Sequence, residues 1–110
     1  MAKRHPQHLR QSAKGEECLL RLFPHCVGWE NSDSVVLCHM PTGDGKMGGK
    51  GPDTWAAYGC SVCHDIIDGR IGAGQHQLSR HDIITSMLRG ICLTQERMKE
   101  KGLITVKGEK

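Results

Sequence analysis

The sequence is short of the residues from which hydrophobic cores are built. Of its 110 residues only Phe23, Trp29, Trp55 and Tyr58 are aromatic, hydrophobic residues make up 37%, and 14 residues are glycine. A chain of this length forms one domain, because two separate cores would each bury too little apolar surface. Small domains with so little core material often depend on disulfides or a structural metal. We therefore expect one domain over residues 1–110, held by a cross-link or an ion.

Long apolar runs are also missing. The N-terminus reads MAKRHPQHLRQSAKGEE, which has basic side chains but lacks the apolar centre of a secretory signal. No stretch approaches the ~20 apolar residues that a membrane span needs. We expect a cytoplasmic protein without a membrane partner. Cysteines stay reduced in that compartment, so six cysteines and seven histidines favour metal binding or catalysis over disulfides.

The chain has only a small excess of positive charge, but the basic residues are concentrated at its two ends. Lysine and arginine number 15 against 12 acidic residues, for a net charge of +3. Four basic residues precede the first acid, Glu16, and the C-terminal end is basic as well. Basic ends steer proteins toward phosphate backbones. The alternative is that both ends are solvated tails without a role.

Turn residues and hydrophobic periodicity predict a mixed α+β chain. The expected elements, in chain order, are a basic arm over 1–16 with a short helix at 5–14, strands at 18–22 and 34–39, a glycine-rich loop at 41–53, a short helix ending at Gly69, and a terminal strand at 103–107. The two early strands are expected to pair as a hairpin. The helix that ends at Gly69 is expected to follow directly from a cysteine-bearing turn.

The clearest predicted element is an amphipathic helix over 79–102. Ser79 followed by Asp82 resembles a capping box, and Gly102 marks the end. The apolar positions recur at three- and four-residue spacing through Met98. Cys92 falls on this stripe, so we expect it to be a small buried side chain and not a ligand.

Residues 60–64 read CSVCH, which matches the attachment pattern of a c-type haem and also half of a zinc site. A reduced compartment and so few large apolar residues disfavour haem. A second pair, Cys18 and Cys26, precedes Cys60 and Cys63, and two cysteine pairs indicate a closed tetrahedral zinc site that contributes folding free energy. His25 is the alternative fourth ligand.

The residues after the second pair indicate a different metal site. If a helix begins near Cys63, His64 and Asp68 lie one turn apart on the same face, as two ligands of one divalent ion must. An imidazole with a carboxylate suits Mn²⁺, Fe²⁺, Ni²⁺, Zn²⁺ or, less well, Mg²⁺. Two protein ligands leave positions open for water and a phosphate oxygen, which is typical of catalysis.

His39 is the candidate base for such an ion. It ends the apolar run SVVLCH, and a rigid strand can aim an imidazole at a water molecule. A lone histidine at a strand end is usually structural. The presence of His64, Asp68 and the cysteine pairs in the same short chain favours the catalytic interpretation.

These features together resemble a known class of enzymes. A strand ending in histidine, a loop, and C-x-x-C-H opening a helix are similar to the HNH nucleases, whose ββα-metal fold surrounds one catalytic ion, often beside a four-cysteine zinc site. The segments EECLLRLFPHC, VLCHM, PDTWAAYGCSVCHDIID and LTQERMKEKGLI, in this order, resemble the YbcO-like nuclease family of phages and prophages. The resemblance covers about residues 16–104 and implies a bacterial or phage-infected cell.

The resemblance also implies roles for individual residues. His39 would deprotonate the attacking water, and His64 would hold an ion that binds the scissile phosphate and stabilises the leaving 3′ oxygen. Asp68 takes the position of a second helix ligand, and Asp53 takes the part of the asparagine that orients the base. HNH enzymes usually place an acid or histidine just before the base, whereas this chain has Cys38, a further candidate ligand.

The expected function is therefore metal-dependent hydrolysis of DNA by an endonuclease, with a host or phage recombination protein as a further candidate partner. The alternative is a zinc-binding nucleic-acid module that has lost catalysis. The candidate phosphate contacts are Arg4, Arg10, Lys46 and Lys50. Trp29 and Trp55 are expected in the core, and His5, His8, His76 and His81 on solvated segments. Monomer and dimer are equally compatible with the sequence.

Overall fold

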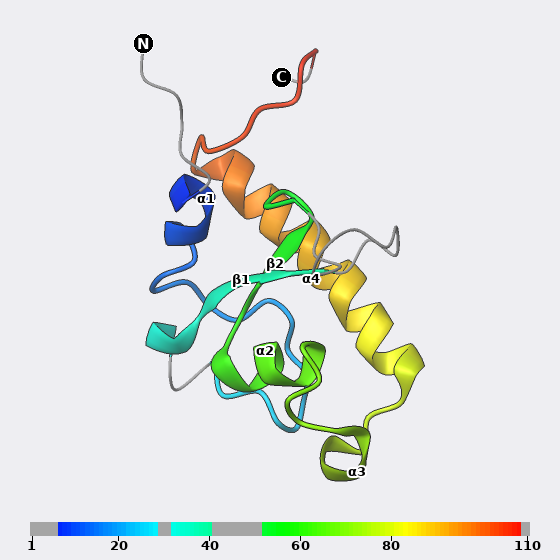
Figure 1. Ribbon diagram of the computed structural model, residues 1–110. Helices are drawn as coiled ribbons and strands as arrows, with labels where there is room; N and C mark the ends of the chain where they lie inside the picture. Colours follow the sequence, from blue (N-terminus) through cyan, green and yellow to red (C-terminus); the bar gives the residue numbers. More distant parts are fainter. Residues whose placement is uncertain (1–6, 29–31, 41–51, 109–110) are drawn as a thin grey trace.

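The computed structural model describes residues 7–28, 32–40 and 52–108 (Figure 1). The predictions for Arg4, His5, Trp29, Lys46 and Lys50 lie outside these residues, as do those for most of the 41–53 loop and for the side chain of His8. The elements are α1 (Gln7–Gln11), a 3-10 turn (Ser32–Ser34), β1 (Val36–His39), β2 (Ala56–Gly59), α2 (Ser61–Ile67), α3 (Ala73–His76) and α4 (Arg80–Glu100). The fold is thus small and α+β, as predicted.

The sheet has two antiparallel strands, β1 and β2, with Val36 opposite Gly59 and His39 opposite Ala56. The run at 34–39 is confirmed as strand-forming. The prediction that it pairs with residues 18–22 is wrong, because its partner lies more than a dozen residues further along the chain. β2 reads AAYG, whose small residues have low strand propensity, so nothing local in the sequence marks it.

The segment 18–22 is not a strand. Leu19 N donates to Tyr58 O at 2.8 Å, so the chain begins to run beside β2. Arg21 then adopts a left-handed backbone with φ of 51°, which no strand residue has. Leu20 and Leu22 are nevertheless buried, which explains why the run is apolar.

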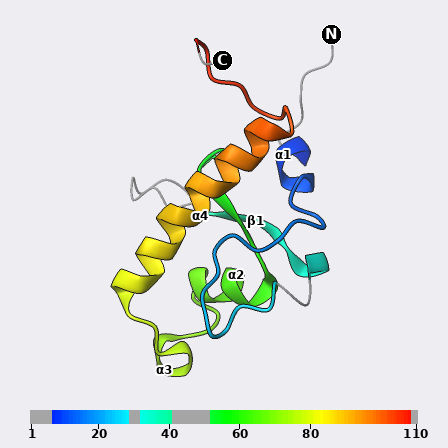
Figure 2. The same ribbon diagram turned by 180° about the vertical axis from the view of Figure 1, so that it is seen from behind.

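The predicted C-terminal helix is confirmed as α4, with Ser79 Oγ accepting from Asp82 N at 3.0 Å. It lies diagonally along the molecule and packs on β2 (Figures 1 and 2). A Cβ at Gly90 would stand 3.2 Å from Ala57 Cβ, so helix and strand approach closely. The buried stripe runs through Gly90, Ile91, Thr94 and Met98, and Cys92 lies outside it and is exposed. The prediction that Cys92 is buried is wrong because residue 92 lies about 100° around the helix from residue 91.

Three further expectations are corrected. Residues 103–107 form no strand, because the chain turns where Leu103 N donates to Met98 O. Trp55 is 38% exposed at the start of β2 instead of lying in the core. His76 is buried, because its carbonyl and ring both accept hydrogen bonds in the turn around α3. His81 is exposed as expected. None of the described helices is long and apolar enough to cross a membrane.

Candidate metal centre and catalytic site

The four predicted zinc cysteines come together in the core. Their sulfur atoms all lie within 4.8 Å of one another, and all four side chains are buried. Cys18 Sγ is 3.7 Å from Cys63 Sγ, and Cys26 Sγ is 3.9 Å from Cys60 Sγ. Four sulfurs bound tetrahedrally to Zn²⁺ at about 2.3 Å would be about 3.8 Å apart. The cluster therefore has the size that a zinc ion requires.

Each of these sulfurs also accepts one backbone N–H. Two dipeptides supply the donors: Arg21 N bonds Cys18 and Leu22 N bonds Cys63, while Val27 N bonds Cys60 and Gly28 N bonds Cys26, all at 3.4–3.5 Å. Such hydrogen bonds stabilise sulfur in its anionic, metal-binding form. The left-handed turn at Arg21 is part of this arrangement, because Arg21 N donates to Cys18 from that conformation.

The cysteines of the cluster differ in their pKa values. Burial raises the pKa of Cys26 to about 12. The pKa of Cys63 is raised, first by its hydrogen bond with Cys18, whereas hydrogen bonds from Cys18 and Cys63 lower the pKa of Cys60. Without a metal, the raised pKa values of Cys26 and Cys63 favour their neutral thiol forms, and the lowered pKa of Cys60 makes it the most readily ionised of the three. Binding a divalent ion must displace the remaining protons.

Gly28 makes the cluster possible sterically. A Cβ at this position would overlap the Cβ of Cys18, and neither backbone can move away without breaking a sulfur contact. The same residue donates its N–H to Cys26. Glycine is therefore required here for close approach of two backbones and not for an unusual φ.

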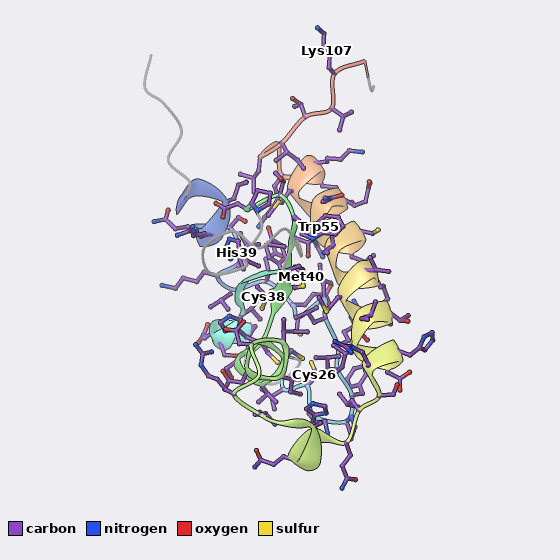
Figure 3. All side chains as sticks on the ribbon, turned by 45° about the vertical axis from the view of Figure 1, so that its right-hand side comes forward. Cys26, Cys38, His39, Met40, Trp55 and Lys107 are labelled. Carbon is purple, nitrogen blue, oxygen red and sulfur yellow. The ribbon has the colours of Figure 1, made fainter. Side chains whose placement is uncertain are left out.

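The predicted base and its proposed orienting residue are in direct contact. His39 Nε2 donates to Asp53 Oδ1 at 2.5 Å, and the two side chains are 14% and 13% exposed. His39 is the last residue of β1, and Asp53 lies in the turn that leads into β2. Figure 3 shows His39 on β1 next to Cys38, well separated from Cys26 in the cysteine cluster. Arg10 Nε lies 3.4 Å from the same Asp53 oxygen.

The predicted ligands on α2 are also paired. His64 Nε2 is 3.2 Å from Asp68 Oδ2, one turn apart. Two ligand atoms that bind one ion at about 2.1 Å in neighbouring positions are about 3 Å apart, so this pair fits a divalent ion. Arg70 NH1 reaches the same Asp68 oxygen at 3.2 Å and Asp65 at 3.1 Å. Because α2 packs against β1, His39 and the His64–Asp68 pair lie on contacting elements.

Cys38 is placed differently from the other candidate ligands. It is completely buried, and a Cβ on Gly59 would stand only 2.7 Å from its sulfur. Burial, and next the neighbouring charge of Cys18, raise the pKa of Cys38 well above its usual range. Its thiol is therefore neutral at physiological pH and directed into the core.

Within the described residues, the four cysteines are the only group of three or more potential ligands that gather closely enough to hold an ion. His25 does not join them, because its Nε2 bonds His76 O at 2.8 Å. The sequence predicts Arg10 as a phosphate contact but not its contact with Asp53, and it gives no role to Arg70; each arginine contacts a carboxylate of the candidate catalytic site. Exposed arginines follow no periodic pattern, so only the three-dimensional contact reveals them.

The fold and these centres define a small α+β protein with a buried cluster of four cysteines that could hold a metal ion. A family described as "Putative nuclease YbcO" matches residues 7–103. The chain is 36% identical to "Putative nuclease YbcO" of Escherichia coli (strain K12) and to "Putative nuclease ybcO" of Enterobacteria phage 82, in each case over 97 residues, 87% of this chain and 95% of the relative. A solved structure described as a putative bacteriophage protein from Escherichia coli K-12 MG1655 superposes with a TM-score of 0.67, at 32% identity, covering 86% of this chain and 100% of that one.

The chain therefore belongs to the YbcO family, as its sequence motifs predicted.

Proposed function

We propose that the protein is a metal-dependent endonuclease of the HNH type, which hydrolyses phosphodiester bonds of DNA in the bacterial cytoplasm and acts as one domain over residues 1–110. The observation that carries this proposal is the contact between His39, the last residue of β1, and Asp53, together with the packing of the helix that carries His64 and Asp68 against β1. The nuclease names of the relatives support the same reaction class.

His39 acts as the general base. Because its Nε2–H is held by Asp53, the second ring nitrogen, Nδ1, is the atom that takes a proton from water. The carboxylate also stabilises the imidazolium that results, as a paired carboxylate does in other histidine-based sites. Both side chains are largely shielded, which limits the geometries that the imidazole can sample.

His64 and Asp68 hold the catalytic divalent ion. When bound, the ion supplies Lewis-acid stabilisation of the negative charge that develops on the phosphate and leaving oxygen. Arg70 occupies the same Asp68 oxygen, so its guanidinium must leave when an ion binds. Its exposed guanidinium, which also pairs with Asp65, then stands beside the site, where its other N–H groups can contact a phosphate of the substrate.

The cysteine cluster fixes the position of these ligands. Cys60 is the N-cap of α2 and Cys63 lies in its first turn, so two zinc ligands belong to the helix that carries His64 and Asp68. A zinc ion there would lock the helix against the 18–28 segment. The structural ion thus maintains the catalytic geometry without taking part in the reaction.

The second candidate is a nucleic-acid-binding module without catalysis. It is favoured by Cys38, a buried neutral thiol at the position where HNH enzymes usually have another metal ligand. Under this alternative, Arg70 remains on Asp68 and no ion replaces it.

Nicking of supercoiled plasmid separates the two candidates. Purified zinc-loaded protein is incubated with plasmid and Mg²⁺, Mn²⁺ or Ni²⁺, next to His64→Ala and a control, Val36→Ala, which alters an exposed side chain on β1. We expect nicking by the wild type and the control with at least one ion, and its loss in His64→Ala. Plasmid binding without nicking under every ion supports the non-catalytic module and rejects the proposal.

A further inference from the structure

A hollow of about 460 Å³ lies between the turn at residues 21–23 and the first half of α4. It is distinct from the catalytic pairs, because none of His39, Asp53, His64 or Asp68 lines it. Figure 2 shows the segment carrying this turn passing beside α4 on the side from which that view is taken. Its volume falls in the range of about 300–1,000 Å³ that small-ligand sites occupy. The residues around it are Arg21, Leu22, Phe23, Leu78, His81, Asp82, Thr85, Ser86 and Arg89.

Phe23 stands at this hollow with 60% of its surface exposed, more than any other large hydrophobic residue of the described chain. Exposing a phenyl ring to this extent is costly in a protein with so few aromatic residues to bury. An exposed ring with an accessible face is the platform on which single-stranded nucleic acids stack their bases.

Two arginines supply positive charge to the same hollow. Arg89 donates one N–H to Leu20 O at 3.0 Å, which fixes its guanidinium while further donors remain available. Arg21 Nε donates to Cys18 O at 3.4 Å, and the same guanidinium pairs with the exposed carboxylate of Glu17 at 3.8 Å. Both guanidinium groups are thus pre-organised, as bidentate phosphate recognition requires.

The side of the hollow formed by α4 is lined by polar residues that recur at the spacing of helical turns. His81 and Asp82, then Thr85 and Ser86, then Arg89 follow one another at turn spacing, so they form one stripe of α4. Hydroxyls can bond either phosphate oxygens or a base edge. Asp82 is the only acid among the lining residues, and two arginines outweigh its charge.

We propose that this hollow binds one nucleotide of a single-stranded nucleic acid, with the base on Phe23 and the adjoining phosphate between Arg21 and Arg89. A base must leave its stack to lie on a protein ring, so duplex is a poor ligand. The proposal goes beyond the proposed reaction, because it uses no catalytic residue and holds for an inactive protein as well.

Fluorescence anisotropy tests the site. The zinc-loaded His39→Ala protein, without added catalytic metal, is titrated with labelled oligothymidylate, with oligouridylate and with a duplex of equal length. In this background Phe23→Leu removes the ring and keeps apolar bulk, and Arg89→Ala removes a lining charge. Arg80→Ala is the matched control, since it removes the same charge from the same helix outside the hollow. Zinc content and circular dichroism verify the fold of each variant.

We expect both single strands to bind more tightly than the duplex. Comparison of oligothymidylate with oligouridylate then shows whether the site prefers deoxyribose or ribose. Phe23→Leu should weaken this binding about fivefold or more with an unchanged salt dependence. Arg89→Ala should lower the slope of log K against log salt by about 0.7, the value of one lost phosphate contact, and Arg80→Ala should not. Unchanged affinity of Phe23→Leu, equal effects of the two arginine variants, or preference for duplex overturns the proposal. Because no cleavage is measured, these outcomes are independent of whether the protein nicks plasmid.

Discussion

At the scale of single residues, the candidate site combines a local pair, His64 and Asp68, with a pair that lies further apart in the chain. His39 and Asp53 are separated by 14 positions, yet they share a hydrogen bond of 2.5 Å. Resemblance to HNH nucleases suggested Asp53, whereas its spacing from the other motifs did not. The sequence could not show this contact, because Asp53 lies in the turn that leads into β2. The position of that turn beside His39 is fixed only when β2 pairs with β1.

Asp53→Ala is expected to slow plasmid nicking by about 10-fold or more, because His39 loses both its orientation and the carboxylate that stabilises its charged form. The measurement is the initial nicking rate at saturating catalytic metal, with zinc content checked. Arg10→Ala removes the other partner of Asp53 and serves as the comparison. A rate for Asp53→Ala equal to the wild-type rate would remove Asp53 from the mechanism.

Gly28→Ala is expected to prevent zinc binding, because the added methyl group overlaps Cys18 and one cluster hydrogen bond is disturbed. Gly74→Ala is the matched control, since a Cβ there meets no atom within 4 Å. Zinc per chain is measured by atomic emission after purification. Full zinc occupancy in Gly28→Ala would show that the two backbones can separate while the cluster survives.

At the scale of elements, α4 could be predicted and β2 could not. α4 has a cap at Ser79, a glycine stop and a long apolar period, all of which are local signals. β2 is short and built of small residues, and its strand conformation comes from pairing with β1 and from α4 packing across it. The turn at Arg21 is likewise set by sulfur contacts, with Arg21 N bonding Cys18 and Leu22 N bonding the distant Cys63, so the apolar run there predicts a strand that the fold does not form.

Thr94 joins these two elements, since its hydroxyl accepts from Tyr58 N at 3.0 Å inside the core. Thr94→Val keeps the shape and leaves this buried N–H without a partner, so we expect a loss of about 1–3 kcal/mol in the free energy of unfolding. Urea denaturation at fixed free zinc provides the measurement. Cys92→Ser, on the exposed side of the same helix, should change stability by about 0.5 kcal/mol or less. A larger effect of Cys92→Ser than of Thr94→Val would contradict the packing described.

At the scale of the whole molecule, the cysteine cluster links two segments that lie far apart in the sequence. It joins the 18–28 segment to the start of α2, so the same atoms hold the fold and position the candidate catalytic helix. The zinc site could be predicted from the two cysteine pairs, because paired cysteines in a reducing compartment usually bind a metal or take part in catalysis. The carboxylate partners of Arg10 and Arg70 could not be predicted from the sequence, because only the folded chain brings these residues together.

Removal of zinc is expected to unfold the protein, since structural zinc contributes about 10–16 kcal/mol in small domains. The helical circular dichroism signal is followed during chelation and after zinc is restored. A metal-free protein that keeps its helical signal and its cooperative unfolding would show that the core suffices without the ion.

Zinc affinity is expected to fall as the pH falls. The raised pKa values of Cys26 and Cys63 mean that these thiols hold protons at neutral pH, and zinc must expel them. The lowered pKa of Cys60 makes its proton the easiest of these to displace. Calorimetric titration in buffers of different ionisation enthalpy should give about two or three protons released per zinc. Binding without proton release would contradict the protonation states described.

The claim on which the function depends is that His39 activates the water that cuts DNA. Its most direct measurement is the nicking rate of zinc-loaded His39→Ala on supercoiled plasmid, beside the wild type and Val36→Ala, with the metal that gives the fastest wild-type reaction. We predict a loss of about 100-fold or more in His39→Ala, with plasmid binding retained and Val36→Ala unaffected. Equal nicking by the wild type and His39→Ala would contradict the account.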